Sequence, residues 1–215
     1  MRESSGTRLI KGFYHRDRST KTGKVMKRVK LKRTSKPGRG KAKGGAFERK
    51  VCKALSLWVS GGDREDLFWR SAMSGGRATQ KLKKGKKLLS QTGDISAIDP
   101  MGDHLVKAYY LECKNYKDLN LAGFLFQRGV LLQKFWDETI EYAFQYEKLP
   151  MLIAKQNQYP TLVLLPEGSI DDLCIEDDVP DFLMYVRYDE PSHPTEIFLF
   201  DEIMQCTIRG EWRGE

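Results

Sequence analysis

The sequence predicts an α/β domain preceded by a strongly basic segment. Two observations indicate this class: stretches with apolar residues at helical spacing alternate with short strand-like apolar runs, and glycine, proline and asparagine lie between them. A chain of 215 residues, 40% of them apolar, suffices for one substantial core. No run approaches the roughly 20 apolar residues of a membrane span, and the amino terminus lacks the apolar core of a secretory signal.

The positive charge is concentrated in residues 1–43, which hold 16 lysines and arginines against two acidic residues. The remainder of the chain is acidic, although the whole has a net charge of +8. A segment of this composition buries too little apolar surface to offset its ordering entropy, so we expect much of it to be disordered when alone. It would bind phosphate backbones by releasing counterions. A solubilising tail or a localisation signal is the alternative.

The first strong helical pattern covers residues 46–59, between two glycine pairs. The first pair, Gly44-Gly45, separates the pattern from the basic segment, and we expect the second, Gly61-Gly62, to end the helix. Apolar and basic residues fall on opposite faces. They are Phe47, Val51, Ala54, Leu55 and Trp58 on one face, and Arg49, Lys50 and Lys53 on the other. Glu48 stands in the first turn, where a carboxylate also suits the helix dipole.

A short strand is predicted at residues 66–71, followed by a Ser-Gly-Gly loop. Residues 77–92 then carry no acidic residue and six basic ones: Arg77, Lys81, Lys83, Lys84, Lys86 and Lys87. The segment is not a phosphate-binding P-loop, because it lacks the Ser/Thr and the upstream glycine of that motif. We interpret it as an exposed basic arm for a phosphodiester substrate, with a solvated charge run as the alternative.

Residues 93–117 carry the candidate chemistry, and they are predicted to form two strands joined by a turn at 100–103. In the second strand a period of two places Glu112 and Lys114 on one face. A hairpin would bring Asp94 alongside them. Two carboxylates suit Mg²⁺, and the lysine can orient a water or offset phosphate charge. The alternative is a solvated ion pair with Asp94 as a turn residue.

Further elements follow in order along the chain. A helical pattern at 121–146 is interrupted at Gly129, and strands are predicted at 151–155, 161–165, 182–186 and 197–200. The four cysteines are far apart in sequence, so we expect free thiols and no zinc site. Cys52 and Cys113 occupy positions that face the predicted core.

The order of these motifs resembles the PD-(D/E)-x-K nuclease superfamily, and within it the archaeal-type Holliday-junction resolvases and their phage relatives. The matching motifs are GGAFER at 44–49, RSAMSG at 70–75, GDI at 93–95, LECK at 111–114 and PMLIAK at 150–155. The resemblance covers roughly residues 44–166. It implies a restriction-endonuclease-like mixed central sheet flanked by helices. Residues 167–215 would form an acidic extension that packs on the core or on a dimer partner.

The resemblance also implies roles for individual residues. Asp94 and Glu112 would hold Mg²⁺, for which Mn²⁺ can substitute, with help from Glu48 and the backbone carbonyl of Cys113. Lys114 would position the attacking water. Gly93 departs from the proline that the superfamily usually has before this aspartate. The nucleic-acid contacts expected are Arg70, Ser71, Ser74, the six basic residues of 77–92, and Gln133, which lies where such nucleases often carry a helical glutamine.

The function expected is metal-dependent cleavage of DNA, first of all at Holliday junctions in recombination or repair. A repair or restriction-type duplex nuclease and a non-catalytic nucleic-acid-binding protein are the alternatives. A resolvase would act as a homodimer. The candidate dimer surface comprises residues 121–126, Phe182, Leu183, Tyr185, Ile197, Leu199 and Phe200, which otherwise cover their own sheet. We expect a cytoplasmic location in a bacterial, archaeal or phage-infected cell, or a nuclear one in a eukaryote, without membrane contact.

Overall fold

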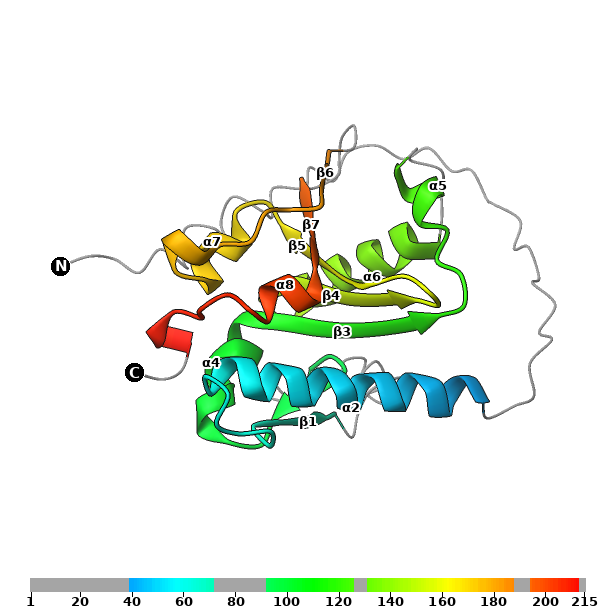
Figure 1. Cartoon of the computed structure of the whole chain (residues 1–215). Helices are drawn as coiled ribbons and strands as arrows, with labels where there is room; N and C mark the ends of the chain where they lie inside the picture. The colour runs from blue at the N-terminus through cyan, green and yellow to red at the C-terminus, as the bar shows by residue number, and fades with distance from the viewer. Residues whose placement is uncertain (1–38, 72–91, 126–130, 188–193, 213–215) are drawn as a thin grey trace.

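The computed structural model describes residues 39–71, 92–125, 131–187 and 194–212, and its centre is a five-stranded sheet (Figure 1). In spatial order the strands are β3 (Tyr109–Tyr116), β4 (Leu149–Gln156), β5 (Thr161–Pro166), β7 (Thr195–Leu199) and β6 (Met184–Val186). The β3–β4 pair is parallel and the other pairs are antiparallel. The predicted mixed sheet is therefore confirmed.

Helices cover both faces of the sheet, as predicted. Helix α2 (Arg39–Val59) packs against one face, and α6 (Leu131–Gln145) packs against the other, after the short α5 (Leu121–Leu125). Strand β3 alternates between the two layers: Leu111 and Cys113 belong to the core beneath α2, whereas Glu112 and Lys114 face the opposite side. The face alternation predicted from the sequence is confirmed.

Helix α2 starts earlier than predicted, at Arg39, so Gly44 and Gly45 lie inside the helix and do not separate it from the basic segment. Its carboxyl end agrees with the prediction. Gly61 and Gly62 have φ values of 69° and 100°, and the Gly62 N–H donates to the Leu57 carbonyl at 2.7 Å, which closes the last turn. The predicted apolar face is buried apart from the partly exposed Ala54.

The predicted turn at 100–103 is wrong, because helix α4 (Pro100–Ala108) occupies this part of the chain. The side chain of Asp99 accepts from the Met101 N–H at 3.0 Å, and Pro100 occupies the first helical position. Strand β2 (Ile95–Ala97) consequently does not form a hairpin with β3. It pairs with β1 (Phe68–Arg70) in a separate antiparallel sheet.

Residues 167–212 are part of the same core, since β7 lies within the sheet between β5 and β6. Helices α7 (Ser169–Leu173) and α8 (Phe200–Ile203) bury apolar residues in the core on the α2 side, and the 3₁₀ helices η1 (Glu176–Asp178) and η2 (Gly210–Trp212) are more exposed. The search for a helix long and apolar enough to cross a membrane found none among the described residues.

Two sequence expectations for this region are corrected. Cys174 and Cys206 form a disulfide, because an antiparallel bridge between Cys174 and Ile208 brings distant segments together. Cys52 and Cys113 are free and buried, as predicted. In the candidate dimer surface, Ile197 and Phe200 are buried in their own core, whereas Phe182, Leu183 and Tyr185 are exposed.

Candidate active site

Asp94 lies against β3, which is an edge strand of the five-stranded sheet. Its N–H donates to the Leu111 carbonyl at 2.8 Å, and its Oδ2 accepts from the Cys113 N–H at 3.0 Å. On the other side, the Ser71 N–H donates to the Asp94 carbonyl at 2.8 Å. These bonds fix a carboxylate with only 8% exposure at the middle of the strand.

The structure explains why glycine, and not the proline usual in the superfamily, precedes Asp94. Its φ is +79°, in the left-handed region that favours glycine, and a Cβ at this position would lie 2.4 Å from the Leu111 carbonyl oxygen. No side chain, proline included, fits this close approach. The glycine therefore lets the backbone reach β3 so that Asp94 can bond to it.

Glu112 and Lys114 project together from β3 toward helix α6 and form an ion pair. The ammonium of Lys114 also lies 5.1 Å from the centroid of the Phe135 ring on α6. Both side chains are mostly buried. The interpretation of Glu112 and Lys114 as a solvated surface pair therefore does not describe them.

Glu48 belongs to α2, which packs against the opposite face of the sheet from α6 (Figure 1). Its Oε2 lies 2.5 Å from Nε of Arg70, which belongs to β1. Arg70 immediately precedes Ser71, whose N–H binds the Asp94 carbonyl. Asp94 and Glu112 therefore lie at one segment of β3, whereas Glu48 is connected to that segment through Arg70 and Ser71.

The charged groups at β3 shift one another's pKa values. Burial raises the pKa of the Asp94 carboxyl to about 7; the negative charges of Glu112 and Glu48 add to this, while the Cys113 N–H and Lys114 oppose it. Burial lowers the pKa of Lys114, but Glu112 and then Asp94 outweigh it, so the net pKa is raised. A raised pKa favours the protonated form of Lys114, which can donate hydrogen bonds.

The donor set fits a hard divalent cation. Asp94 and Glu112 supply carboxylate oxygens, the ligands that Mg²⁺ prefers, and the raised pKa of Asp94 marks negative charge that a cation would offset. The Cys113 carbonyl points to the same side as its N–H, toward Asp94, as the predicted ligand role requires. Among the described residues, no three His, Cys, Asp or Glu side chains converge closely enough to hold a metal.

Only some of the residues predicted to contact nucleic acid lie in the described part of the chain. Arg70 and Ser71 adjoin Asp94. On α6, Gln133 donates from Nε2 to the Asp137 carboxylate at 2.8 Å. The others, Ser74, Arg77, Lys81, Lys83, Lys84, Lys86 and Lys87, lie outside the described residues.

Lys148 is a residue that sequence reasoning missed. It is 2% exposed, and its ammonium donates to the Thr92 hydroxyl at 2.6 Å and to the Val106 carbonyl. Burial lowers its pKa to about 8. Lys148 thus anchors the chain two residues before Asp94. In sequence it lies at a helix-to-strand connection, where a lysine is ordinarily on the surface, so no signal identified it.

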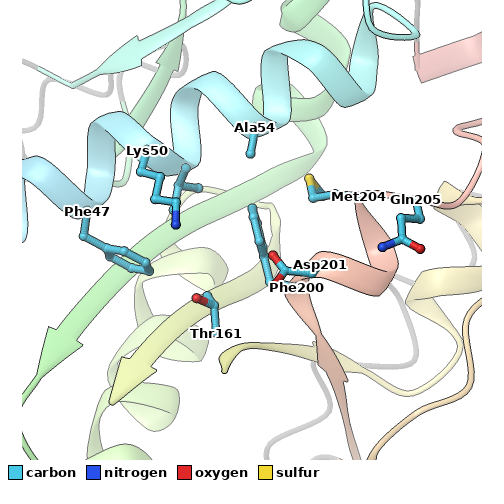
Figure 2. A pocket seen from close by; sticks show the side chains of 9 residues that line it. Phe47, Lys50, Ala54, Thr161, Phe200, Asp201, Met204 and Gln205 are labelled. Atoms are coloured by element: carbon cyan, nitrogen blue, oxygen red, sulfur yellow. The ribbon is translucent and has the colours of Figure 1, made fainter. Parts of the chain in front are cut away.

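A pocket of about 320 Å³ lies elsewhere, between α2, the start of β5 and α8 (Figure 2). Phe47 and Lys50 reach it from α2, and Phe200 and Asp201 from α8. Its lining comprises Phe47, Lys50, Val51, Ala54, Thr161, Phe200, Asp201, Met204 and Gln205. None of the predicted catalytic residues lines this pocket, so the candidate site is the carboxylate cluster at β3.

Comparison with protein families gives one finding. The sequence model of a family described as "Phage putative PDDEXK endonuclease" matches residues 39–206. The match extends beyond the 44–166 range of the resemblance and includes all of α2 as well as α8. No match was found among curated proteins or among solved structures.

Proposed function

Because the chain belongs to this phage PDDEXK endonuclease family, we propose that it hydrolyses DNA phosphodiester bonds with a divalent metal ion at the β3 cluster. The observation that carries the proposal is the position of Asp94, which is bonded directly to the stretch of the edge strand β3 that carries Glu112 and Lys114. The family match supports the reaction class, and this geometry supports the choice of these residues for the reaction.

Each residue has a proposed role that follows from the chemistry of its side chain. Asp94 and Glu112, with the Cys113 carbonyl, would hold Mg²⁺, which supplies Lewis-acid stabilisation of the phosphate charge and acidifies a water. Lys114, protonated and held beside Glu112, donates hydrogen bonds that orient the attacking water or a phosphate oxygen. Glu48 on α2 is paired with Arg70, the residue before Ser71. The ring of Phe135 packs beside the ammonium of Lys114.

We propose that the substrate is branched DNA, with a four-way junction as the first choice. The two residues that flank the basic segment 72–91, Ser71 and Thr92, both lie beside Asp94. The sequence between these two residues carries six basic residues and no acidic one, a composition that suits contact with a phosphate backbone. Residues 1–38 add 13 lysines and arginines before α2.

The test is cleavage of a four-way junction, a linear duplex and a single strand, each with Mg²⁺ or EDTA. We expect metal-dependent cleavage, fastest on the junction, and no cleavage by Asp94→Asn, which should still bind DNA. Duplex cleavage alone would favour the repair or restriction-type nuclease. Cleavage in EDTA, or full activity of Asp94→Asn, would refute the metal assignment. Binding without cleavage would leave a non-catalytic nucleic-acid-binding protein.

A second measurement addresses the basic segment at the amino terminus. A variant that lacks residues 1–38 keeps α2 intact, since the helix starts at Arg39. Its affinity for DNA should fall, and the dependence of log K on log salt should become shallower, because fewer counterions are released. An unchanged salt slope would show that the segment does not contact DNA.

A further inference from the structure

Two exposed tyrosines lie where strands β3 and β4 end. Tyr116 is the last residue of β3 and is 41% exposed, and Tyr159, in the connection from β4 to β5, is 50% exposed. The Asn157 N–H donates to the Tyr116 carbonyl at 3.1 Å, which joins this connection to the end of β3. The two tyrosines therefore belong to the same end of the sheet.

Tyr116 is linked to the candidate active site through the ring of Phe135. The Tyr116 and Phe135 ring centroids are 4.9 Å apart, and the Lys114 ammonium lies 5.1 Å from the Phe135 centroid. Tyr116 also follows Lys114 by two residues on β3, a spacing of about 7 Å along a strand. That is about the length of two stacked nucleotides. A DNA strand that contacts Lys114 would therefore have its neighbouring nucleotides within reach of Tyr116.

Two lysines contact the β4–β5 connection from different elements. The Lys43 ammonium, on α2, donates to Asn157 Oδ1 at 2.6 Å, and the Lys155 ammonium, on β4, donates to the Tyr159 carbonyl. Figure 1 shows the amino-terminal end of α2 at the same end of the molecule as the arrowheads of β3 and β4. The exposed tyrosines and these lysines therefore form one surface.

The sequence that forms this surface is basic. Residues 39–47 of α2 contain three basic residues and residues 155–160 contain one, and neither range contains an acidic residue. In the link after β3, the exposed Lys117 is followed by the exposed Asp118. The excess of positive charge favours an anionic partner.

Aromatic rings combined with lysines suit single-stranded nucleic acid, because bases stack on the rings and phosphates pair with the cations. Inside a duplex both faces of each base are covered by its neighbours, so stacking on a tyrosine requires unpaired nucleotides. We propose that Tyr116 and Tyr159, with Lys43 and Lys155, form a subsite for unpaired nucleotides next to the phosphate that is cleaved. The proposal rests on the function proposed above and narrows its substrate to DNA with a branch or a free strand.

The competing interpretation is that Tyr116 only covers Phe135, and three substitutions separate the two. Tyr116→Leu keeps an apolar group next to Phe135 but removes the aromatic face. Tyr116→Phe keeps the ring and removes only the hydroxyl. Phe144→Leu is the matched control, because Phe144 is 50% exposed and lies at the far end of α6 from Phe135.

The experiment measures the affinity for fluorescein-labelled DNA by anisotropy in EDTA, together with the melting temperature of each variant. The ligands are a single strand, a duplex with a single-stranded flap, and a blunt duplex. For Tyr116→Leu we expect the affinity for the single strand and the flap to fall about 5-fold or more, the effect of losing one stacked base. Tyr159→Leu should show the same selectivity.

The controls should bind differently from these variants. The affinity of Tyr116→Leu for the blunt duplex should stay within about twofold of the wild type, as should that of Tyr116→Phe and Phe144→Leu for all three ligands. The proposal is overturned if Tyr116→Leu binds the single strand as the wild type does, or loses affinity equally for the blunt duplex. A loss in Tyr116→Phe equal to that in Tyr116→Leu would also overturn it, since the hydroxyl and not stacking would then be responsible.

The outcome for this subsite can be told apart from the outcome for catalysis. Cleavage by the wild type in Mg²⁺, combined with unchanged single-strand binding by Tyr116→Leu, would overturn the subsite and leave the proposed function standing. Selective loss of single-strand binding in Tyr116→Leu, with no cleavage by the wild type, would support the subsite and refute the nuclease activity. A wild-type protein that binds neither the single strand nor the flap would overturn the subsite directly.

Discussion

The two edges of the central sheet are built differently. At the β3 edge, Asp94 bonds to the strand backbone, and the side chains of Glu112 and Lys114 are charged and largely buried. At the β6 edge the strand has only three residues, and Phe182 and Leu183 beside it are about half exposed. One edge thus uses backbone groups to order charged side chains, and the other presents apolar surface. Substitutions at the two edges should therefore affect different properties.

The largest effect should come from Glu112→Gln at the β3 edge. The substitution keeps the shape of the side chain but removes a carboxylate ligand and the ion pair with Lys114. We expect cleavage to fall by about 10³-fold or more, in line with loss of a group that stabilises transition-state charge. Tyr185→Phe at the β6 edge, which loses only a hydrogen bond to Glu167, is the control and should cleave at the wild-type rate. Equal rates for the two variants would contradict the site assignment.

The second effect is on stability and follows from the buried charge of Asp94. The folded carboxyl keeps its proton up to about pH 7, whereas the unfolded one releases it near 3.8. Between these pH values the folded state binds more protons, so the free energy of unfolding falls as pH rises, and the loss is complete above pH 7. In EDTA at pH 8, Asp94→Asn should therefore be more stable than the wild type, by as much as about 4 kcal/mol.

Urea unfolding at pH 5 to 8 measures this difference. Asp103→Asn on α4 is the control, because Asp103 is partly exposed and its i,i+4 ion pair with Lys107 is of the kind that contributes little to stability. Added Mg²⁺ should raise the stability of the wild type at pH 8 more than that of Asp94→Asn. If Asp94→Asn in EDTA is no more stable than the wild type at pH 8, the carboxyl is not strained by its surroundings.

These charged residues show what the sequence could and could not predict. The alternation along β3 was predictable because a period of two is local, and it identified Glu112 and Lys114 correctly. Helix α4 was missed because proline, glycine and aspartate suit a helix start as well as a turn. The need for Gly93 depends on the Leu111 carbonyl, which only the tertiary structure brings near.

The same reasoning applies to the residues that support the site. The burial of Lys148 depends on Thr92 and Val106, 56 and 42 residues away, and no local pattern encodes those contacts. The pairing of Cys174 with Cys206 likewise depends on how distant segments meet. Sequence patterns therefore indicated the candidate site residues, while the contacts that hold the neighbouring chain in place became visible only in the fold.

The next prediction concerns the free energy of unfolding and compares Gly93→Ala with Gly168→Ala near β7. The effect is smaller than that expected for Asp94→Asn. Both glycines have similar positive φ values, +79° and +74°, but only at Gly93 would the new Cβ collide with backbone. Gly168→Ala should cost about 1 kcal/mol for the left-handed conformation. Gly93→Ala should cost roughly 2 kcal/mol more, since the backbone must move. Equal losses in denaturant unfolding would show that the close approach to β3 does not constrain residue 93.

The smallest effect on folding is expected at the β6 edge, where we propose that two copies of the chain meet. Leu183 is 55% exposed, so Leu183→Asp should change the free energy of unfolding by no more than about 0.5 kcal/mol. In a two-fold dimer each chain would place one such negative charge in the interface, so the association of the two chains should weaken strongly. Ile98→Asp is the control, since Ile98 is 63% exposed and lies on the β1–β2 side.

Light scattering gives the oligomeric state of each variant, and a junction with both arms labelled reports whether its two cuts are paired. We expect Leu183→Asp to be monomeric and to make single, uncoupled cuts, while its affinity for Mn²⁺ stays that of the wild type. Ile98→Asp should keep both the dimer and the paired cuts. A wild-type protein that is monomeric at micromolar concentration would remove the β6 interface from the proposal. It would leave the β3 edge as a nuclease site that acts one strand at a time, because one chain carries one such carboxylate cluster among its described residues.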